Sequence, residues 1–389
     1  MGGAPLSLLT LLKQMDRDRF DPIAVFLRDS RMVQIFSEEG IPSRVEPGIN
    51  YFSHTTGERF YAGNPRALKQ LIDYGPSIAC TRRLVNEIKP DIVHCNSSTL
   101  SAQVIGAKQA GVKVVWHIRE HVVPGVLGLR RRLHYTVGRR YADALVFILA
   151  SEDRRFNCPG KSVVVPNFVN FAVFDRQLRH HASESPSRPP TVVFFGGLSR
   201  IKGALELVRA FPLVRRAMGD VKFLLVGAGV EPGHAGLATR LKRLGTRVVG
   251  RKGYAEQVRD LTKLDNNGGI ELLGVVEDVP SLLARSDLVV FPSTVPHFAR
   301  PIIEAAAMGL PVVASDLEGP RELVRPGSTG LLVEPGNHVA LAEAIISLLS
   351  DKALAARMGE NGYAMARELF DAQDNSQKII DLYDRLLGE

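Results

Sequence analysis

The sequence predicts an α/β protein made of two similar domains, each built on a parallel sheet. Short runs rich in β-branched residues alternate with helical patterns along the whole chain, which is typical of βαβ units. The polar, Pro- and Ser-rich segment "RHHASESPSRPP" interrupts this alternation and indicates a linker. With 389 residues the chain is long enough for two separate cores. We therefore expect domains at 1–178 and 191–370, joined by a linker at 179–190.

Each expected domain contains a series of short apolar strands followed by helices. In the first half we expect strands at 22–28, 91–96, 112–118 and 144–149, with helices at 65–89 and 100–110. The same pattern restarts with "TVVFFGGLSRIKG" and continues through "DLVVFPS" and "PVVAS". Near the start, Gly2 and Gly3 precede "PLSLLTLLKQM" like a glycine turn that follows a first strand, yet no strand precedes them. The N-terminal sheet is therefore expected to lack its first strand, or the start lies too far downstream.

The composition is typical of a soluble globular protein, with 45% hydrophobic and 23% charged residues. The net charge of +8 suggests an anionic partner, which could be nucleic acid, a phosphorylated ligand or an anionic membrane surface. The three cysteines show neither metal-ligand spacing nor close pairing, which fits a reducing compartment. No run approaches the ~20 apolar residues of a spanning helix, and the N-terminus does not resemble a signal peptide. A cytoplasmic protein is expected, with any membrane contact made from the surface.

A candidate anion-binding turn lies in "FFGGLSRIKG". Gly196 and Gly197 follow a strand and allow close backbone approach, and a helix is expected to begin near Gly203. A helix N-terminus with its free N–H groups favours an anion. Arg200 and Lys202 place two cations beside the same turn. The alternative is an ordinary βα turn with solvated basic side chains.

A second concentration of titratable groups is "WHIREH", at the end of an expected strand. In open α/β sheets, ligands bind beyond the carboxyl ends of the strands. Strand alternation sends His117 and Arg119 to the same side, with Glu120 and His121 beside them. A polar loop without function is the alternative, but the position favours a functional site.

Glu304 is the one carboxylate between Pro292 and Ala314, beside the apolar start of an expected helix. With Pro301 as the first helical residue, Glu304 falls in the first turn, where the helix dipole stabilises an anion by ~0.3–1 kcal/mol. That stabilisation alone would explain the residue. Its loop, however, comes to the carboxyl edge of the sheet, where a carboxylate suits the vicinal hydroxyls of a ribose. The backbone N–H groups of the preceding residues could hold phosphates; these residues are Phe298, Ala299 and Arg300.

The segment "LRRRLHYTVGRRYA" places five arginines between Arg130 and Arg140, interleaved with apolar residues. A basic amphipathic helix of this kind can lie on anionic lipid. A solvated helix face is the more common outcome for such a pattern.

Taken together, these segments resemble the GT-B glycosyltransferases, and specifically glycosyltransferase family 4. The resemblance covers nearly the whole chain and is strongest in "GGLSRIKGALELVRAF", "LLGVVEDVPSLLARSDLVVFPS" and "ARPIIEAAAMGLPVVASDLEGPRELVRPGSTGLLVEPGN". The N-terminal segments "GGAPLSLLTLL", "DIVHCNSSTLSAQVIGAKQAGVKVVW" and "VVVPNFVNFAVF" match more loosely. The motifs are specific for this family only as a set, because no single motif would suffice to indicate the resemblance.

This resemblance implies two Rossmann-like domains that face a cleft. A nucleotide-sugar donor would be bound mainly by the C-terminal domain, and a glycan or lipid-linked acceptor mainly by the N-terminal one. Transfer would retain the configuration at the anomeric carbon and need neither metal nor other cofactor. The Asp-x-Asp spacing in "MDRDRFD" does not change this expectation, because it ends a helix and mixes with two arginines. The C-terminal helix at 371–389 would pack back onto the N-terminal domain.

The resemblance also assigns roles to individual residues. Lys202 takes the place of the family's lysine, which neutralises the diphosphate leaving group, and Arg200 would have to replace an arginine whose position holds Gly197. Glu304 matches the glutamate that holds the ribose hydroxyls, and Val276 matches a position that lines the base. The donor would also meet the glycine turns, which are Gly2, Gly3, Gly196 and Gly197.

Three departures from the family pattern affect the expected chemistry. The family's first glutamate would fall at Pro296, so the carboxylate expected near the donor sugar is absent. The glycine usual after the phenylalanine is Ala299. The family's N-terminal histidine aligns with Arg119, while His117 lies two residues earlier, and either could approach the donor.

The leading hypothesis is a retaining glycosyltransferase, active in cell-surface polysaccharide or lipopolysaccharide assembly. Nucleic acid is not an expected partner. Pro296 supports a rival, a catalytically impaired partner subunit that binds a nucleotide sugar without transferring it. A nucleotide-sugar 2-epimerase on the same architecture is a more distant alternative.

Overall fold

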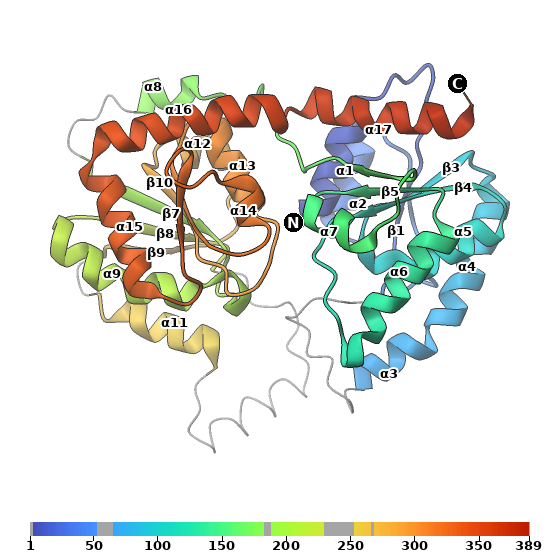
Figure 1. Cartoon of the computed structure of the whole chain (residues 1–389), viewed down its shortest axis with the longest axis horizontal. Coiled ribbons are helices and arrows are strands. Elements are labelled where there is room, and N and C mark those ends of the chain that lie inside the picture. Colours follow the sequence, from blue (N-terminus) through green and yellow to red (C-terminus); the bar gives the residue numbers. More distant parts are fainter. Residues whose placement is uncertain (1–2, 53–64, 183–187, 229–252, 266–267, 389) are drawn as a thin grey trace. The chain divides into compact units, whose positions relative to one another are not determined.

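The computed structural model describes residues 3–52, 65–182, 188–228, 253–265 and 268–388 (Figure 1). The chain forms two compact units, Met1–Asn170 with Leu369–Glu389, and Phe171–Glu368. The segment expected as a linker, 179–190, lies inside the second unit and begins within helix α8 (Gln177–Ala182). Arg179 anchors it there, because its Nη1 donates to the carbonyl oxygens of Met308 at 3.2 Å and Gly309 at 2.6 Å.

The N-terminal unit combines six strands with eight α-helices and two 3-10 turns among its described residues. Its strands are β1 (Ala24–Phe26), β2 (Ser43–Val45), β3 (Ile92–Cys95), β4 (Lys113–Ile118), β5 (Ala144–Phe147) and β6 (Ser162–Val164). Its helices are α1 (Gly3–Lys13), α2 (Arg31–Glu38), α3 (Pro65–Ile72), α4 (Tyr74–Ile88), α5 (Ser101–Gln109), α6 (Leu129–Tyr141), α7 (Ala150–Phe156) and α17 (Ala372–Leu387), with η1 (Ser98–Leu100) and η2 (Val126–Gly128).

The strands of this unit form two separate parallel sheets. One sheet pairs β1 with β2, and the other has the order β3-β4-β5-β6. Within the described residues no backbone ladder joins the two, and the sequence-based expectation of an incomplete N-terminal sheet agrees with this split. The C-terminal helix α17 belongs to this unit, and its Ile379, Ile380 and Tyr383 are buried in a core shared with α1.

Side-chain alternation along β4 separates two cores on the two faces of the larger sheet. Val115 belongs to the core that α1 and α17 cover. Val114 and Trp116 point to the opposite face and join a core that includes Val104 of α5 and Val137 of α6. Because successive side chains of a strand point to opposite faces, β4 is buried on both sides and reads as a continuous apolar run.

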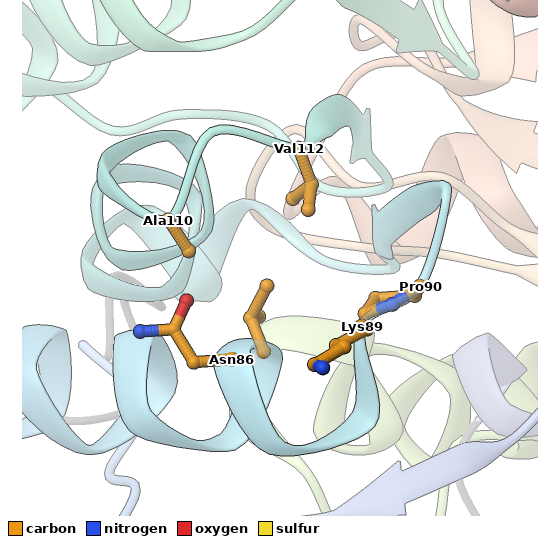
Figure 2. Close-up of a pocket in the computed structure, with 6 residues that line it drawn as sticks. Asn86, Lys89, Pro90, Ala110 and Val112 are labelled. Carbon is orange, nitrogen blue, oxygen red and sulfur yellow. The ribbon is translucent and has the colours of Figure 1, made fainter.

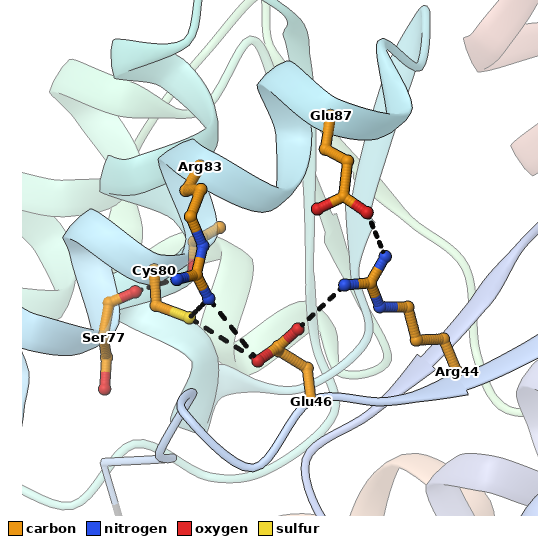
Figure 3. Close-up of polar contacts among 7 residues, drawn as sticks. Arg44, Glu46, Ser77, Cys80, Arg83 and Glu87 are labelled. Carbon is orange, nitrogen blue, oxygen red and sulfur yellow. Dashed lines mark hydrogen bonds and ion pairs between the residues drawn. The ribbon is translucent and has the colours of Figure 1, made fainter.

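An ion-pair cluster fastens the small sheet to α4 (Figure 3). Arg44 of β2 contacts Glu87 of α4, with 2.6 Å between Nη1 and Oε1. Glu46 is 8% exposed and lies 3.4 Å from Arg44 Nη2 and 3.8 Å from both Arg83 Nη2 and Cys80 Sγ. Burial and the nearby Glu46 raise the pKa of the Cys80 thiol, which disfavours its thiolate form.

The second unit is a six-stranded sheet with helices between its strands. Its strands are β7 (Thr191–Phe195), β8 (Lys222–Val226), β9 (Ile270–Leu273), β10 (Leu288–Phe291), β11 (Val312–Ser315) and β12 (Gly330–Val333). Besides α8, its helices are α9 (Ala204–Met218), α11 (Tyr254–Lys263), α12 (Val279–Ala284), α13 (Arg300–Ala307), α14 (Pro320–Leu323), α15 (His338–Ser350) and α16 (Lys352–Leu369), with the 3-10 turn η3 (Arg200–Lys202).

The order of these parallel strands is β12-β11-β10-β7-β8-β9. The chain runs outward from β7 through β8 to β9, then returns to β10 on the other side of β7. The neighbouring strands β7 and β10 therefore form a topological switch point, where the loops that leave their carboxyl ends diverge. The loops 196–203 and 292–299 lie at this point, so the fold marks them as the ligand-binding edge of the unit.

Candidate functional site

The two loops at the switch point are fastened to each other. Gly203 has φ 81°, and a Cβ on it would lie 1.8 Å from the carbonyl oxygen of Pro292. Thr294 then ties the second loop to the first, because its N–H donates to Ile201 O and its hydroxyl to Arg200 O, both at 3.0 Å. Only glycine permits this approach at position 203. The loops therefore form one rigid edge.

The glycines of the expected anion-binding turn serve close packing. A Cβ on Gly196 would lie 1.9 Å from the ring of Phe194, and one on Gly197 would lie 2.8 Å from Gly227 O. The N–H of Gly197 donates to Val226 O at 2.8 Å, so this group is not available to an anion. The N–H of Gly197 is thus used to join the turn to β8, and contact of Gly196 and Gly197 with the donor stays a prediction.

Lys202 is the cation of this turn that is best placed to bind an anionic ligand. Its side chain is half-buried, and no hydrogen bond or ion pair to it occurs among the described residues. Burial lowers the pKa of its ammonium group from the usual value. A partly desolvated cation without a carboxylate beside it gains most from an anionic ligand.

Arg200 has a different environment from Lys202. It is exposed, and its guanidinium lies over the ring of Tyr254, 5.2 Å from the centroid. Tyr254 also accepts a hydrogen bond at its hydroxyl from the N–H of Leu205, at 2.8 Å, in the first turn of α9. Burial raises the pKa of Tyr254 to about 12, so it remains a neutral phenol. No motif in the sequence points to Tyr254, whose hydroxyl binds one of the N–H groups at the start of α9.

Glu304 departs from the sequence-based expectation in one respect. Helix α13 begins at Arg300, so Glu304 is outside the first turn and the helix dipole does not explain it. The residue is 9% exposed, and its carboxylate accepts from Arg300 Nε at 2.6 Å through Oε1. Among the described residues Oε2 has no hydrogen-bond partner. One carboxylate oxygen therefore stays open for a ligand hydroxyl, and the side chain of Arg300 positions the other.

The residues that precede α13 supply backbone donors. In the part of the chain that the structure describes, the N–H groups of Phe298 and Ala299 have no hydrogen-bond acceptor, although the two residues are 7% and 1% exposed. Such groups at a helix N-terminus favour phosphate oxygens. Pro296 is half-buried in this loop, and Val276 is half-buried in the segment that follows β9. The segment 292–299 itself contains no carboxylate.

In the N-terminal unit, Arg119 is surrounded by amide groups. Its Nε donates to Asn96 Oδ1 at 2.6 Å and its Nη1 to Asn167 Oδ1 at 2.5 Å. Asn96 in turn donates from Nδ2 to Ala4 O at 3.0 Å, at the start of α1. Arg119 is 5% exposed. The structure thus brings the arginine of "WHIREH" to the end of the first helix through two asparagines that sequence reasoning did not identify.

The other expected residues of this unit are placed as follows. Gly3 begins α1 and is exposed, whereas Gly2 lies outside the described residues. His117, at the end of β4, is 1% exposed and contacts His94. Glu120 caps the 3-10 turn η1, because its Oε2 accepts from the N–H of Ser98 at 2.9 Å, and its role is therefore structural.

The basic helix α6 presents only part of the charge that its sequence suggests. Arg130 is 8% exposed, and its guanidinium lies 5.6 Å from the ring centroid of Phe52. The prediction that Arg130 belongs to a membrane-facing surface is therefore wrong. Arg132, Arg139 and Arg140 are exposed.

Three further observations limit the choice of site. Among the described residues, no three His, Cys, Asp or Glu side chains are grouped to hold a metal. No helix in the described ranges is long and apolar enough to cross a membrane. A pocket of about 420 Å³ lies beside Asn86, Lys89 and Pro90 (Figure 2), but it is near the amino ends of β3 and β4, opposite the edge that carries Asn96 and His117.

Known proteins share both the sequence pattern and the fold. Residues 175–365 match the family described as Glycosyl transferases group 1. An N-acetyl-alpha-D-glucosaminyl L-malate synthase of Bacillus anthracis is 26% identical over 305 residues, 76% of this chain and 72% of that protein. A phosphatidyl-myo-inositol mannosyltransferase of Mycobacterium leprae is 30% identical over 228 residues, 57% of this chain and 53% of that protein, so about half of that relative is spanned.

Among solved structures, Anabaena HepE in complex with UDP-glucose superposes with a TM-score of 0.73 at 24% identity, over 99% of this chain and 96% of that chain. The two parallel α/β units are thus those of the GT-B fold. The chain is a glycosyltransferase, and its residues 175–365 match the glycosyl transferases group 1 family.

Proposed function

We propose that this chain is a retaining, metal-independent transferase of glycosyltransferase family 4. It would move a sugar from a nucleotide-sugar donor to a glycan or lipid-linked acceptor, in cell-surface polysaccharide or lipopolysaccharide synthesis. The observation that carries the proposal is Lys202, a partly desolvated cation without an anionic partner among the described residues, at the switch point of the second unit. The name of the mannosyltransferase relative and the UDP-glucose bound to HepE support this choice of substrate class.

In this proposal, the switch-point edge holds the donor through its nucleotide half. The open Oε2 of Glu304 accepts a hydrogen bond from a ribose hydroxyl. The N–H groups of Phe298 and Ala299 donate to phosphate oxygens, with the exposed Arg200 available beside them. As the bond to the sugar breaks, negative charge grows on the diphosphate, and Lys202 stabilises it more strongly than it stabilises the ground state.

A screen of UDP-, GDP- and ADP-sugars by thermal shift, followed by transfer assays, tests this proposal. The donor that binds is expected to raise the melting temperature of the wild type and to raise that of Lys202→Met much less. Lys222→Met is the matched control, since Lys222 lies at the amino end of β8 in an ion pair with Glu271. If no nucleotide sugar binds or turns over, the proposal fails.

Pro296 favours one competing candidate, a nucleotide-sugar-binding partner subunit without transfer activity. The Pro296→Glu variant separates the two candidates. If the wild type binds the donor but transfers nothing, and Pro296→Glu gains turnover, the chain is a binding subunit. A 2-epimerase would instead interconvert free nucleotide sugars without any acceptor, which chromatography of the donor alone would detect.

Side chains near the starts of α4 and α6 support the proposal of a lipid-linked acceptor. Phe52 joins the two starts, because the ring of Tyr74 packs edge-on against it at 5.5 Å and Arg130 lies over it at 5.6 Å. Four exposed aliphatic side chains lie within three residues of Tyr74 or Arg130; they are Leu71, Ile72, Leu127 and Leu129, with exposures of 60%, 64%, 86% and 58%. We call these four residues the aliphatic rim.

The proposed partner of this rim is an anionic bilayer surface. The segment 127–141 contains no acidic residue, and its exposed arginines, Arg132, Arg139 and Arg140, complement anionic headgroups. Leu127 keeps φ 50°, a left-handed conformation that a leucine rarely adopts, while exposing nearly its whole side chain. Such an arrangement suits insertion of the leucine into the interfacial layer.

Co-sedimentation with vesicles of phosphatidylcholine, with and without phosphatidylglycerol, tests the membrane contact. Binding is expected only with the anionic lipid and should weaken in high salt. The double variant Leu127→Ser/Leu129→Ser should lose most of it, whereas Leu264→Ser, an equally drastic change at a 75% exposed position in the second unit, should not. Equal binding to neutral vesicles, or no effect of the double variant, would argue against the rim.

A further inference from the structure

Three side chains connect the C-terminal helix to the end of β4 in the N-terminal unit. The hydroxyl oxygen of Tyr383, on α17, lies 2.5 Å from His94 Nδ1. His94 Nε2 lies 3.3 Å from His117 Nδ1. At the end of this row, His117 Nε2 is buried and has no hydrogen-bond partner among the described residues. His117 lies at the carboxyl end of β4, the edge at which open α/β sheets bind ligands.

The tyrosine sets the direction of these hydrogen bonds. Within the described part of the chain, the hydroxyl of Tyr383 contacts His94 alone, and Tyr383 is 6% exposed. If this oxygen only accepted from His94, its own hydrogen would be buried without an acceptor, at a cost of about 1–3 kcal/mol. The hydroxyl therefore donates to His94 Nδ1.

The positions of the remaining protons follow from the chemistry of a neutral imidazole, which has one donor and one acceptor nitrogen. Since Nδ1 of His94 accepts, its Nε2 carries the hydrogen and donates to His117 Nδ1. His117 must then carry its hydrogen on Nε2, which becomes a donor without an acceptor in the described structure.

Both rings are held in the neutral form. Burial, followed by the charge of Arg119, lowers the pKa of His94 to about 3. Burial, Arg119 and the neighbouring His94 lower the pKa of His117 well below its usual value. Burial raises the pKa of Tyr383, so its hydroxyl keeps the proton that it donates. No member of the row changes its charge near neutral pH.

We propose that Tyr383 is a positioning residue which, through His94, fixes the proton of His117 on Nε2 and makes this nitrogen a hydrogen-bond donor to a substrate oxygen. The oxygen belongs to a hydroxyl or phosphate group of the bound substrate. A nitrogen that already carries hydrogen cannot remove a proton, so His117 orients the substrate and does not act as a general base. The substrate part of this inference rests on the proposed transferase function, and the proton positions do not.

Long-range ¹H–¹⁵N correlation spectra of the full chain with labelled histidine test the proton positions. The wild type is expected to show an unprotonated Nδ1 and a protonated Nε2 for both His94 and His117. In Tyr383→Phe the ¹⁵N chemical shifts of His94 should change. His117 should then be a mixture of the Nε2-protonated and Nδ1-protonated tautomers. A cationic His117 at neutral pH, or one protonated on Nδ1, would overturn the inference.

Kinetics separate a positioning role from a merely structural one. Tyr383→Phe is expected to lower kcat/KM about tenfold, the loss expected for one hydrogen bond to a substrate group. Because Tyr383 acts only through His117, adding Tyr383→Phe to a His117→Gln variant should not lower kcat/KM any further. Additive losses would instead show that the tyrosine acts by another route. Tyr363→Phe is the matched control, a tyrosine of α16 whose hydroxyl has no partner among the described residues.

Ligand titration distinguishes failure of this inference from failure of the proposed function. UDP-glucose, GDP-mannose and ADP-glucose serve as probes, together with the acceptor identified by the transfer assays. If a probe binds in calorimetry but saturation leaves the Nε2–H signal of His117 unmoved, the substrate contact is refuted and the transferase proposal stands. If no probe binds at all, the proposed function fails and the contact to substrate falls with it, while the proton positions are still decided by the spectra.

Discussion

Arg300 and Glu304 form an ion pair one turn apart in α13, with Arg300 Nε 2.6 Å from Glu304 Oε1. Both side chains are largely buried, at 19% and 12% exposure, so the pair is held in one geometry. One oxygen of Glu304 is thereby occupied, and the carboxylate can grip a ligand through Oε2 alone. The arginine determines where that oxygen points.

Glu304→Gln is expected to weaken donor binding about tenfold, because a neutral amide accepts a hydrogen bond from a hydroxyl less strongly than a carboxylate does. Calorimetry with the nucleotide sugar found in the thermal-shift screen measures the change. Glu271→Gln serves as the control, since Glu271 pairs with Lys222 away from the site. Equal affinities for the wild type and Glu304→Gln would remove the glutamate from the donor site.

Arg300→Met should destabilise the second unit by about 1–3 kcal/mol, because it leaves the carboxylate of Glu304 buried without its partner. The double variant Arg300→Met/Glu304→Gln should recover part of this loss, since the neutral amide costs less to bury. Urea unfolding followed by hydrogen exchange of peptides from α13 gives both values. If the single and double variants are equally stable, the ion pair does not stabilise the fold.

The switch-point edge was largely predictable from sequence, and the details of its contacts were not. The glycines, Lys202 and the residues before α13 stand at the ends of recognisable strands, so the edge they share follows from the parallel topology. The expected and the observed starts of α13 differ by one residue, because the helix begins at Arg300 and not at Pro301. The ion pair with Glu304 depends on that difference.

Local sequence patterns did not predict the contacts between distant segments. Tyr254 reaches Leu205, and Tyr383 reaches His94 across 289 residues of sequence. Arg130 belongs to a row of arginines that looks uniformly solvated, yet the ring of Phe52 covers it. Periodicity identifies the face of a helix, but it cannot show which single side chain meets an aromatic ring from another element.

The buried histidines predict a pH dependence of local stability. His94 and His117 have lower pKa values in the folded chain than the ~6.5 of an unfolded one, so the unfolded state binds more protons below that pH. Above about pH 6.5 neither ring affects the free energy of unfolding. Below that pH the local free energy of unfolding falls by up to about 1.4 kcal/mol per pH unit for each ring, and for His94 this fall ends near pH 3.

Hydrogen exchange of peptides that span β3 and β4, compared at about pH 7 and pH 5.5 after correction for intrinsic exchange rates, measures this loss. The variant His94→Gln removes one titrating ring and should show a smaller change in protection between the two conditions. A wild type with the same protection at both values would contradict the neutral, buried state of the rings.

Gly203 and Gly388 allow the close approach of the two switch-point loops to be tested separately from backbone strain. Both glycines are left-handed, with φ 81° and ψ 31° at Gly203 and φ 86° and ψ 23° at Gly388, the C-cap of α17. A Cβ at Gly203 would meet Pro292 O at 1.8 Å, whereas one at Gly388 would have no described atom within 4 Å. Gly388→Ala should therefore cost only the left-handed backbone, about 1–2 kcal/mol. Gly203→Ala should cost well over that and also weaken donor binding, because the loop that carries Lys202 must move away from Pro292. Chemical unfolding and calorimetry on both variants give the comparison. If the two alanine variants were equally stable and bound the donor equally well, contact between the loops would not be what holds Lys202 in place.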